Sequence, residues 1–252
     1  LDGTTRIRDA KGEPVLHGNF VSGFSNRTVV PEGGVVPIRK DMPLDWACLM
    51  SCAVPTGWGS VAKVADVKPA DKVAVWGLGG VGQNVLRAAK MRQAYPLIAV
   101  DLEESRRDVA MELGATHFLC NANEDPIPII QELTGGGVDF AFEVSGDPGA
   151  VEQAWWALRT AGKLMIVGIM PQQAYAKLNL TFLGFHQKAI VGNLYGSVAV
   201  QDDIPKLVDL AVNGDLKIDK IIEGYFRLEQ INEIAEKMEK RRLNGRWIID
   251  WD

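Results

Sequence analysis

The chain has 252 residues, 47% of them hydrophobic, with a formal net charge of −5 and a sequence pI near 5.3. A mildly acidic protein lacks an overall attraction to polyanions, so nucleic acid and anionic membrane surfaces are excluded as expected partners. The composition allows a substantial core, and no apolar run reaches the ~18 residues of a membrane-spanning helix.

Cysteine usage and the N-terminus bear on location. The three cysteines, Cys48, Cys52 and Cys120, match neither a disulfide framework nor a CxxC zinc motif. An odd, low number suits a reducing compartment, and the first residues, LDGTTR, show no signal-peptide pattern, so we expect a cytoplasmic protein. Because the chain lacks an initiator methionine, we expect it to begin partway into a longer protein.

The N-terminal part differs in character from the rest. Residues 1–44 are rich in Gly, Pro, Val and Thr, which predicts short strands at 27–30 and 34–38 with turns between them. Residues 44–67 favour helix, with a predicted break at Pro55-Thr56-Gly57.

From Asp71 onward apolar strands alternate with helices. Strands are predicted at 72–76, 96–100, 117–120, 138–144, 164–167, 188–194 and 245–251. Helices are predicted at 80–90, 104–113, 126–133, 149–159, 201–213 and 228–242. This alternation predicts an α/β fold, a doubly wound parallel sheet of the Rossmann type, with right-handed crossovers.

The sharpest motif is Gly77-Leu78-Gly79-Gly80-Val81-Gly82, which matches GxGxxG between a predicted strand and a predicted helix. Gly77 permits the tight turn, Gly79 lets the backbone approach a pyrophosphate, and Gly82 lets the helix pack closely on the strand. The helix N-terminus then offers N–H groups and a positive dipole end to phosphate. The alternative is a glycine-rich turn without a ligand.

Asp101 ends the second of these strands, 19 residues beyond Gly82. Its carboxylate can accept hydrogen bonds from ribose hydroxyls and would repel the extra phosphate of NADP, which predicts NAD as the cofactor. Arg106 could contact the ribose or Asp101 and weakens the exclusion of NADP. Leu102, the residue after Asp101, is also a predicted cofactor contact. A solvated acid at a helix start is the alternative.

Several segments together resemble the zinc-containing, medium-chain alcohol dehydrogenases. Residues 49–60, LMSCAVPTGWGS, resemble the family segment that leads into the Rossmann domain. Residues 187–188 and 192–197 look most like bacterial class III members. The similarity runs from about Asp2 to the C-terminus. Further matches are Gly114-Ala115-Thr116, Phe142-Glu143-Val144-Ser145-Gly146, Gly162-Lys163-Leu164, Val167-Gly168 and Leu243-Asn244-Gly245-Arg246.

The resemblance implies two roles in the predicted helical segment. Cys52 would be a thiolate ligand of a catalytic zinc, although a single free cysteine is more often a small buried hydrophobe. Thr56 would lie beside the nicotinamide ring and exclude the wrong hydride face, although it also fits a helix cap. Cys48 and Cys120 are expected to be core cysteines.

Further cofactor contacts are implied at strand ends, where ligands bind in open α/β sheets. Simple strand-end packing is the alternative for these positions, and an exposed strand arginine is the alternative for Arg246. The resemblance places five residues against the ribose and nicotinamide: Val144, Ser145, Val167, Gly168 and Ile169. It places Asn193 and Tyr195 at the carboxamide and Arg246 at the pyrophosphate.

The sequence departs from the family at the metal. A catalytic zinc needs three protein ligands, and the family takes the others, with its proton relay, from an N-terminal region that has no counterpart here. His17, His117 and His186 match no family ligand position and are expected to be structural or surface residues. Cys52 by itself would hold zinc poorly.

The resemblance thus implies an NAD-dependent alcohol dehydrogenase that passes hydride between a primary or secondary alcohol and NAD, with zinc polarising the alcohol oxygen in the intact enzyme. We expect this chain alone to bind NAD(H) but to oxidise alcohols poorly or not at all. The alternatives are a non-catalytic NAD-binding fragment and a zinc-independent quinone or enoyl reductase of the same superfamily. Asp101 and Cys52 argue against the reductase.

Three regions follow from this interpretation. Residues 54–194 form the Rossmann domain, and residues 1–53 and 195–252 form an incomplete β-rich catalytic domain, which should expose apolar surface and strand edges. Family members pair through their Rossmann sheets, so residues 188–194 are the candidate edge strand of a homodimer or higher homo-oligomer. The expected substrate is a small alcohol or aldehyde.

Overall fold

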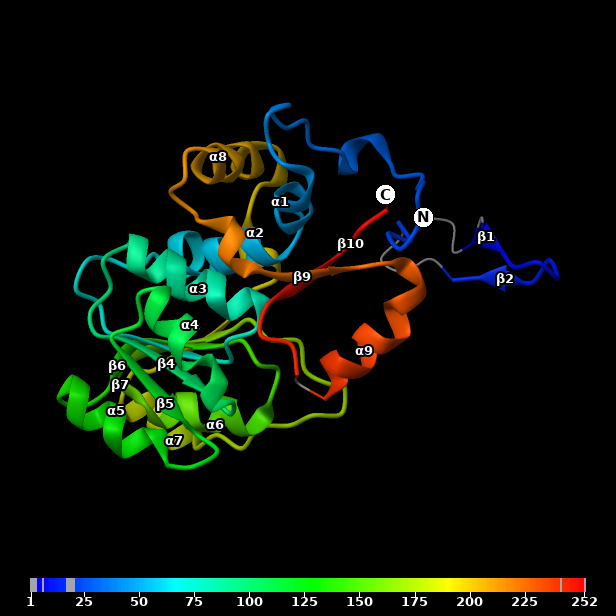
Figure 1. Cartoon of the computed structure of the whole chain (residues 1–252). Coiled ribbons are helices and arrows are strands. Elements are labelled where there is room, and N and C mark those ends of the chain that lie inside the picture. The colour runs from blue at the N-terminus through cyan, green and yellow to red at the C-terminus, as the bar shows by residue number, and fades with distance from the viewer. Residues whose placement is uncertain (1–3, 6, 17–20, 241, 252) are drawn as a thin grey trace.

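A parallel sheet forms the centre of the protein. The computed structural model describes residues 4–5, 7–16, 21–240 and 242–251. The six strands follow the order β5-β4-β3-β6-β7-β8, and every neighbouring pair is parallel (Figure 1). The predicted doubly wound α/β sheet is therefore confirmed. Its strands are β3 (Val73–Trp76), β4 (Leu97–Asp101), β5 (His117–Cys120), β6 (Val138–Glu143), β7 (Leu158–Ile166) and β8 (Ala189–Gly192).

Two apolar cores cover the two faces of this sheet. One contains Val75 and Ala99 of the strands with Val85 of α3, and the other contains Trp76 with Ala154 of α6. Neighbouring strand residues thus point to opposite faces, which explains why the strand sequences are apolar throughout. The helices around the sheet are α2 (Ala53–Gly59), α3 (Gly80–Met91), α4 (Arg107–Glu112), α5 (Pro126–Thr134), α6 (Pro148–Trp156) and α7 (Leu180–Phe185).

The predicted helix at 149–159 and strand at 164–167 need correction. α6 ends at Trp156, and β7 already begins at Leu158. The pairing of β6 with β7 shifts register between Val138 and Phe140, and Ala161 has a left-handed φ of 62°. This irregular start of β7 carries no clean apolar pattern, which is why the sequence favours a longer helix there.

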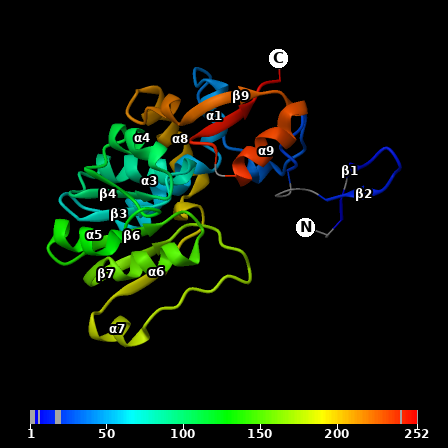
Figure 2. The same cartoon turned by 60° about the horizontal axis from the view of Figure 1, so that its bottom comes forward.

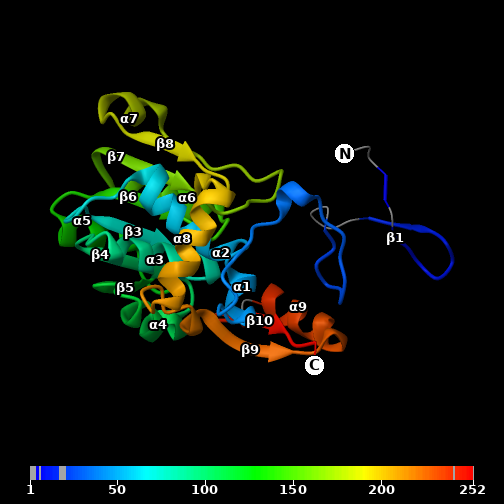
Figure 3. The same cartoon turned by 90° about the horizontal axis from the view of Figure 1, so that it is seen from above.

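A third core joins two distant parts of the chain. Leu49 of α1 (Leu44–Leu49) and Val54 belong to the same apolar core as Leu207 and Val208 of α8 (Val200–Val212). α8 lies beside α2 (Figure 3). The helical segment breaks between α1 and α2, not at Pro55-Thr56-Gly57 as predicted. Pro55 is tolerated because it lies in the first turn of α2, where no N–H is needed for the helix ladder.

The remaining elements lie at the two ends of the chain. The predicted strands at 27–30 and 34–38 are wrong: the described segment there holds the 3₁₀ helix η2 (Glu32–Gly34) and backbone that pairs with no strand. The sequence also missed β9. These end elements are the hairpin β1 (Ile7–Arg8) and β2 (Pro14–Val15), then β9 (Ile222–Phe226), α9 (Ile231–Glu239) and β10 (Arg246–Ile249), where β9 and β10 pair in parallel beside α9 (Figure 2).

Among the described residues, none of the helices combines the length and apolarity that crossing a membrane requires. The remaining helical elements are short. The π-helical η3 (Ser60–Ala65) continues α2, and the 3₁₀ turns are η4 (Glu104–Arg106), η5 (Tyr195–Ser197), η6 (Ile218–Ile221) and η7 (Leu228–Gln230).

Candidate functional site

The glycine loop joins β3 to α3 at the carboxyl edge of the sheet. Gly77 has a φ of 91°, and a Cβ added to it would lie 2.8 Å from Ser145, so a side chain is disfavoured on two counts. A Cβ added to Gly82 would lie 1.8 Å from the carbonyl oxygen of Gly77. The loop and the first turn of α3 therefore pack so closely that both positions require glycine.

Gly79, unlike Gly77 and Gly82, faces open space. The nearest atom to an added Cβ is Nη1 of Arg106, 4.0 Å away. Gly79 is the N-cap of α3, a helix of 12 residues, and no described side chain caps that helix. The first N–H groups of α3 are thus left for a ligand, next to the positive end of the helix dipole.

Arg246 begins β10 and lies against the first turn of α3. A Cβ on Gly80 would lie 2.0 Å from its Nε. That Nε is buried and has no hydrogen-bond partner within the described part of the chain. A guanidinium at the positive end of a helix is unfavourable without a counter-charge. The arrangement therefore suits an anion, to which arginine donates strong charge-assisted hydrogen bonds.

Asp101 ends β4 with its carboxylate turned toward the glycine loop. Its Oδ2 accepts the N–H of Leu78 at 2.6 Å, and its Oδ1 accepts the N–H of Glu103 at 3.0 Å. The Nε of Arg106 lies 3.7 Å from Oδ1, and the two side chains are only 9% and 10% exposed. Asp101 therefore braces the glycine loop, and Arg106 lies beside it in a position to contact a ligand at Gly79.

Glu143 ends β6 and is fully buried. Its Oε1 accepts hydrogen bonds from the N–H and Oγ of Ser145 and from the N–H of Gly146, at 2.7, 2.6 and 2.8 Å. Its backbone oxygen accepts the N–H groups of Val167 and Gly168. Burial raises the pKa of the Glu143 carboxyl despite these donors. One residue thus holds the ends of β6 and β7 together.

The other predicted strand-end residues lie along this same edge. The N–H of Val144 donates to the carbonyl of Trp76 at 2.9 Å. A Cβ added to Gly168 would lie 2.4 Å from the backbone nitrogen of Gly146, so the ends of β6 and β7 are in close contact. Ile169 and Leu102 are 87% and 40% exposed, and they flank the site without closing it.

A second group of predicted residues lies where α2 meets η5. Thr56 is buried inside α2, so the helix-cap alternative is wrong, and its carbonyl accepts the Oγ–H of Ser60 at 2.6 Å. The same Oγ lies 3.2 Å from Oδ1 of Asn193. Nδ2 of Asn193 is buried and has no partner among the described atoms, and the Tyr195 hydroxyl donates to the carbonyl of Ser51 at 2.7 Å.

Cys52 lies next to this second group. It is the N-cap of α2, and its thiol is free and exposed. Burial and the nearby Cys52 raise the pKa of Tyr195. The expected buried position of Cys120 is confirmed, but that of Cys48 is wrong: Cys48 is exposed, with its thiol donating to the carbonyl of Asp45 at 3.0 Å. In the described chain, no three Cys, His, Asp or Glu side chains gather as metal ligands.

The histidines make other contacts. Nδ1 of His117 lies 2.9 Å from Oγ1 of Thr116. His186 packs on Phe182 with ring centroids 5.1 Å apart. His17 lies outside the described residues. The structure therefore gives His117 and His186 local partners of the kind expected for structural residues.

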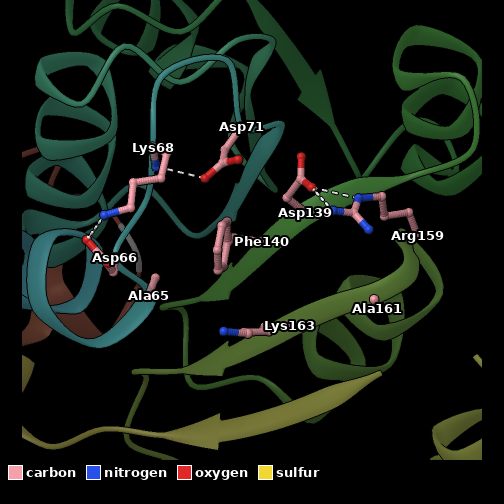
Figure 4. Close-up of a pocket in the computed structure, with 9 residues that line it drawn as sticks. All are labelled: Ala65, Asp66, Lys68, Asp71, Asp139, Phe140, Arg159, Ala161 and Lys163. Atoms are coloured by element: carbon pink, nitrogen blue, oxygen red, sulfur yellow. Dashed lines mark hydrogen bonds and ion pairs between the residues drawn. The ribbon is translucent and has the colours of Figure 1, made fainter. Parts of the chain in front are cut away.

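A separate cavity of about 300 Å³ lies at the opposite, amino edge of the sheet (Figure 4). Its charged side chains largely pair with one another: Asp66 with Lys68, and Asp139 with Arg159. Lys163 instead lies over the ring of Phe140, 5.8 Å from its centroid. None of the sequence-predicted site residues lines this cavity.

Sequence reasoning missed several residues that shape the site. Glu143 stands at the end of an otherwise apolar strand, a polar residue in a buried context that could have signalled its role. Gln83 of α3 reaches the carbonyl of Asn244, and Ser60 joins Thr56 to Asn193. These contacts join distant parts of the chain, so no local pattern predicts them.

The strand order, the glycine loop and the free N-terminus of α3 define a Rossmann-type α/β protein. The family model described as zinc-binding dehydrogenase matches residues 80–213. The chain therefore belongs to the zinc-binding dehydrogenase family, and its resemblance to zinc-containing alcohol dehydrogenases is confirmed.

Individual relatives agree with this assignment. The chain is 38% identical over 235 residues to "Alcohol dehydrogenase-like 5" of Arabidopsis thaliana, covering 91% of the chain and 60% of that protein. It is 34% identical over 242 residues to "Alcohol dehydrogenase class-3" of Cereibacter sphaeroides, covering 92% and 64%. The crystal structure of an alcohol dehydrogenase zinc-binding domain protein from Burkholderia ambifaria superposes with a TM-score of 0.89 at 34% identity, covering 96% of this chain and 66% of that one. The chain thus spans under two thirds of the two curated relatives.

Proposed function

We propose that this chain binds NAD(H) at the carboxyl edge of the sheet, beside the glycine loop. It would supply the cofactor-binding part of an NAD-dependent alcohol dehydrogenase. One observation carries the proposal: Arg246 lies at the uncapped N-terminus of α3, next to the open side of Gly79, with its buried Nε unpartnered among the described residues. This combination of N–H groups, helix dipole and guanidinium matches what a pyrophosphate requires. The names of the two curated relatives, alcohol dehydrogenase-like 5 and class-3 alcohol dehydrogenase, support the reaction class.

The residues present fit a dinucleotide along the carboxyl edge. Backbone N–H groups of the first turn of α3 would hold the pyrophosphate, with Arg246 and Arg106 as its positive partners. Asp101 would hold the adenosine ribose, and its charge favours NAD over NADP. When bound, NAD supplies the hydride chemistry, while the protein orients it.

The nicotinamide end would lie between the two groups of site residues. Ser145 and Gly168 are held by Glu143 at the ends of β6 and β7. Thr56 and Asn193 are linked through Ser60, and the buried Nδ2 of Asn193, which has no partner among the described residues, would donate to a carboxamide. We propose that Thr56 packs beside the ring, with Asn193 and Tyr195 bordering the carboxamide.

Zinc does not fit the described residues as they stand. A catalytic zinc takes three protein ligands, and Cys52 is the single residue we propose as one of them. In the described chain Cys52 belongs to no group of three Cys, His, Asp or Glu side chains, so the residues present do not support a proton or hydride step at a metal. This observation favours a second candidate function, NAD binding without efficient alcohol turnover by these residues alone.

Packing supports the proposed division of the chain. The third apolar core draws on residues 42–54 and 204–221, apart from the two cores of the sheet. We propose that 54–194 form the cofactor domain, while 1–53 and 195–252 belong to a second unit. β8 is one of the two edge strands of the sheet, and we propose that it pairs with β8 of a second copy.

The test is a titration of the 252-residue protein with NADH and, in parallel, NADPH. Energy transfer from tryptophan to the reduced nicotinamide gives the readout, because Trp58 and Trp76 lie in α2 and at the end of β3. We expect NADH to bind at least tenfold more tightly than NADPH, about 1.4 kcal/mol. Absence of binding by protein that circular dichroism shows to be folded would refute the proposal.

A further inference from the structure

Arg246 reaches α3 because of the loop that precedes it, here called the 243–245 loop (Leu243, Asn244 and Gly245). The Rossmann domain holds this loop from one side: Nη2 of Arg106 donates to the carbonyl of Leu243 at 3.0 Å, and Nε2 of Gln83 donates to the carbonyl of Asn244. Both donors belong to elements that flank the glycine loop. Arg106 and Gln83 therefore fix the backbone of the 243–245 loop, which places Arg246 at the N-terminus of α3.

Glu223 of β9 holds the loop from the other side. Its Oε2 accepts the N–H of Asn244 at 2.7 Å and the N–H of Gly245 at 2.8 Å. A Cβ added to Gly245 would lie 2.5 Å from the carbonyl oxygen of Ile221, so the loop fits tightly against the start of β9. The carboxylate thus fixes the two residues immediately before Arg246.

The pairing of β9 with β10 explains how Glu223 reaches the loop. Arg246 pairs with Ile222, whereas Trp247 pairs with Gly224, so Glu223 is the extra residue of a bulge. A bulge re-aims the side chain that it carries. Glu223 is exposed, so its two hydrogen bonds are not required to satisfy a buried charge.

We propose that Glu223 is a positioning residue that sets the affinity of Arg246 for the pyrophosphate of a dinucleotide. Ordering the 243–245 loop before a ligand arrives removes that entropic cost from binding. This inference rests on the proposed function, because it takes Arg246 as a pyrophosphate contact. It adds a residue outside the phosphate site that controls that contact.

The experiment measures the dissociation constants of ADP and adenosine by calorimetry on the whole chain and its variants. ADP contains the pyrophosphate and adenosine does not. We expect Glu223→Ala to raise the dissociation constant of ADP about 3- to 10-fold and to change that of adenosine less than 2-fold, as loss of one preordered segment predicts. Glu223→Gln, which keeps one acceptor, should fall between the wild type and Glu223→Ala.

Two comparisons separate positioning from general damage. Glu229→Ala removes another exposed glutamate of the same C-terminal segment and should leave both constants unchanged. In an Arg246→Ala background, Glu223→Ala should add nothing, since the two residues act through one contact. Equal losses for ADP and adenosine, or additive losses with Arg246→Ala, would overturn the positioning role.

Hydrogen exchange in the ligand-free protein distinguishes this proposal from the proposed function. We expect the amides of Asn244 and Gly245 to exchange faster in Glu223→Ala than in the wild type or Glu229→Ala. A wild type that binds neither ADP nor NADH would refute both proposals. A wild type that binds both, with unchanged ADP affinity and unchanged exchange in Glu223→Ala, would overturn this inference alone.

Discussion

The two ends of the proposed active site differ in how completely this chain builds them. At the nucleotide end, the glycine loop packs against Ser145, and Asp101, Arg106 and Arg246 converge on it from separate elements. At the Cys52 end, an exposed thiol stands with no group of metal-ligating side chains around it among the described residues.

The difference separates cofactor binding from alcohol chemistry. The contacts at the nucleotide end are buried, close and made within the described chain, so affinity for NADH should be a property of these residues. A metal site needs several ligands held at once. Substitutions at the two ends should therefore have unequal effects on NADH affinity, largest at the glycine loop and smallest at Cys52.

Gly82→Val should have the largest effect. The added Cβ would lie 1.8 Å from the carbonyl oxygen of Gly77, and neither backbone can move without disturbing the loop or α3. We expect a loss of at least about 3 kcal/mol of unfolding free energy, at the upper end for overpacking, and no measurable NADH binding. Urea denaturation and NADH titration provide the measurements.

Gly184→Ala is the matched control for Gly82→Val. Gly184 lies in α7, and nothing described lies within 4 Å of its added Cβ. The change should stabilise the protein by up to about 1 kcal/mol through helix propensity, with NADH affinity unchanged. Similar losses in both variants would show that glycine replacement in general, and not the close loop packing, is responsible.

Glu143→Ala should come next. Removing the carboxyl leaves the N–H groups of Ser145 and Gly146 without their acceptor, at a cost of about 2 to 3 kcal/mol in unfolding free energy. The ends of β6 and β7 should also loosen, which weakens NADH binding. Glu143→Gln retains an acceptor and should lose less than half as much stability, measured by urea denaturation at neutral pH.

Glu143 also predicts a dependence of stability on pH. Its pKa is raised in the folded state by burial, so the folded protein holds this proton more tightly than the unfolded chain does. The contribution is favourable below the pKa of this carboxyl in the unfolded chain and is lost as pH rises through its higher folded-state pKa. The wild-type minus Glu143→Gln difference in unfolding free energy should change with pH in that direction. A difference that stays constant with pH would contradict the prediction.

The local structure at the proposed nucleotide site could be predicted from the sequence. β3, the glycine loop and α3 are adjacent in the chain, and each glycine answers a short-range steric need, so the pattern is written in consecutive residues. The same holds for the apolar strands and for Asp101 at the end of β4. Here local pattern and final structure agree because the packing partners are close in sequence.

The sequence predictions that were wrong or missing concern structure that depends on partners far away in the chain. Residues 27–30 and 34–38 have strand-like composition, but a strand also needs a neighbour with which to pair, and composition does not supply one. The role of Glu143 depends on turns that follow two different strands, and that of Glu223 on a bulge opposite β10. Cys48 is a further example, because the face of α1 that is buried is set by the third apolar core, which draws on distant residues from 204 to 221.

Asp101→Asn should shift cofactor preference more than stability. The amide oxygen can still accept the N–H of Leu78, so the glycine loop should keep its shape, while the N–H of the partly exposed Glu103 loses its acceptor. Loss of the charge removes repulsion of a 2′-phosphate and releases Arg106, whose Nε lies 3.7 Å from Oδ1. We expect the ratio of NADPH to NADH affinity to rise about tenfold, roughly 1.4 kcal/mol, in parallel fluorescence titrations. An unchanged ratio would remove Asp101 as the discriminating residue.

Cys52→Ser should have the smallest effect on the nucleotide end. The thiol is exposed, and the replacement is close in size, so we expect unfolding free energy within about 0.5 kcal/mol of the wild type and an NADH dissociation constant within about 2-fold. Arg246→Gln, measured alongside, should weaken NADH binding about tenfold or more, because it removes a charge-assisted contact. Zinc content of both proteins, measured by atomic absorption after dialysis against the metal, reports on the other end. If Cys52→Ser weakened NADH binding as strongly as Arg246→Gln does, the two ends would be energetically coupled. Cofactor affinity would then depend on the Cys52 end as well as on the nucleotide end.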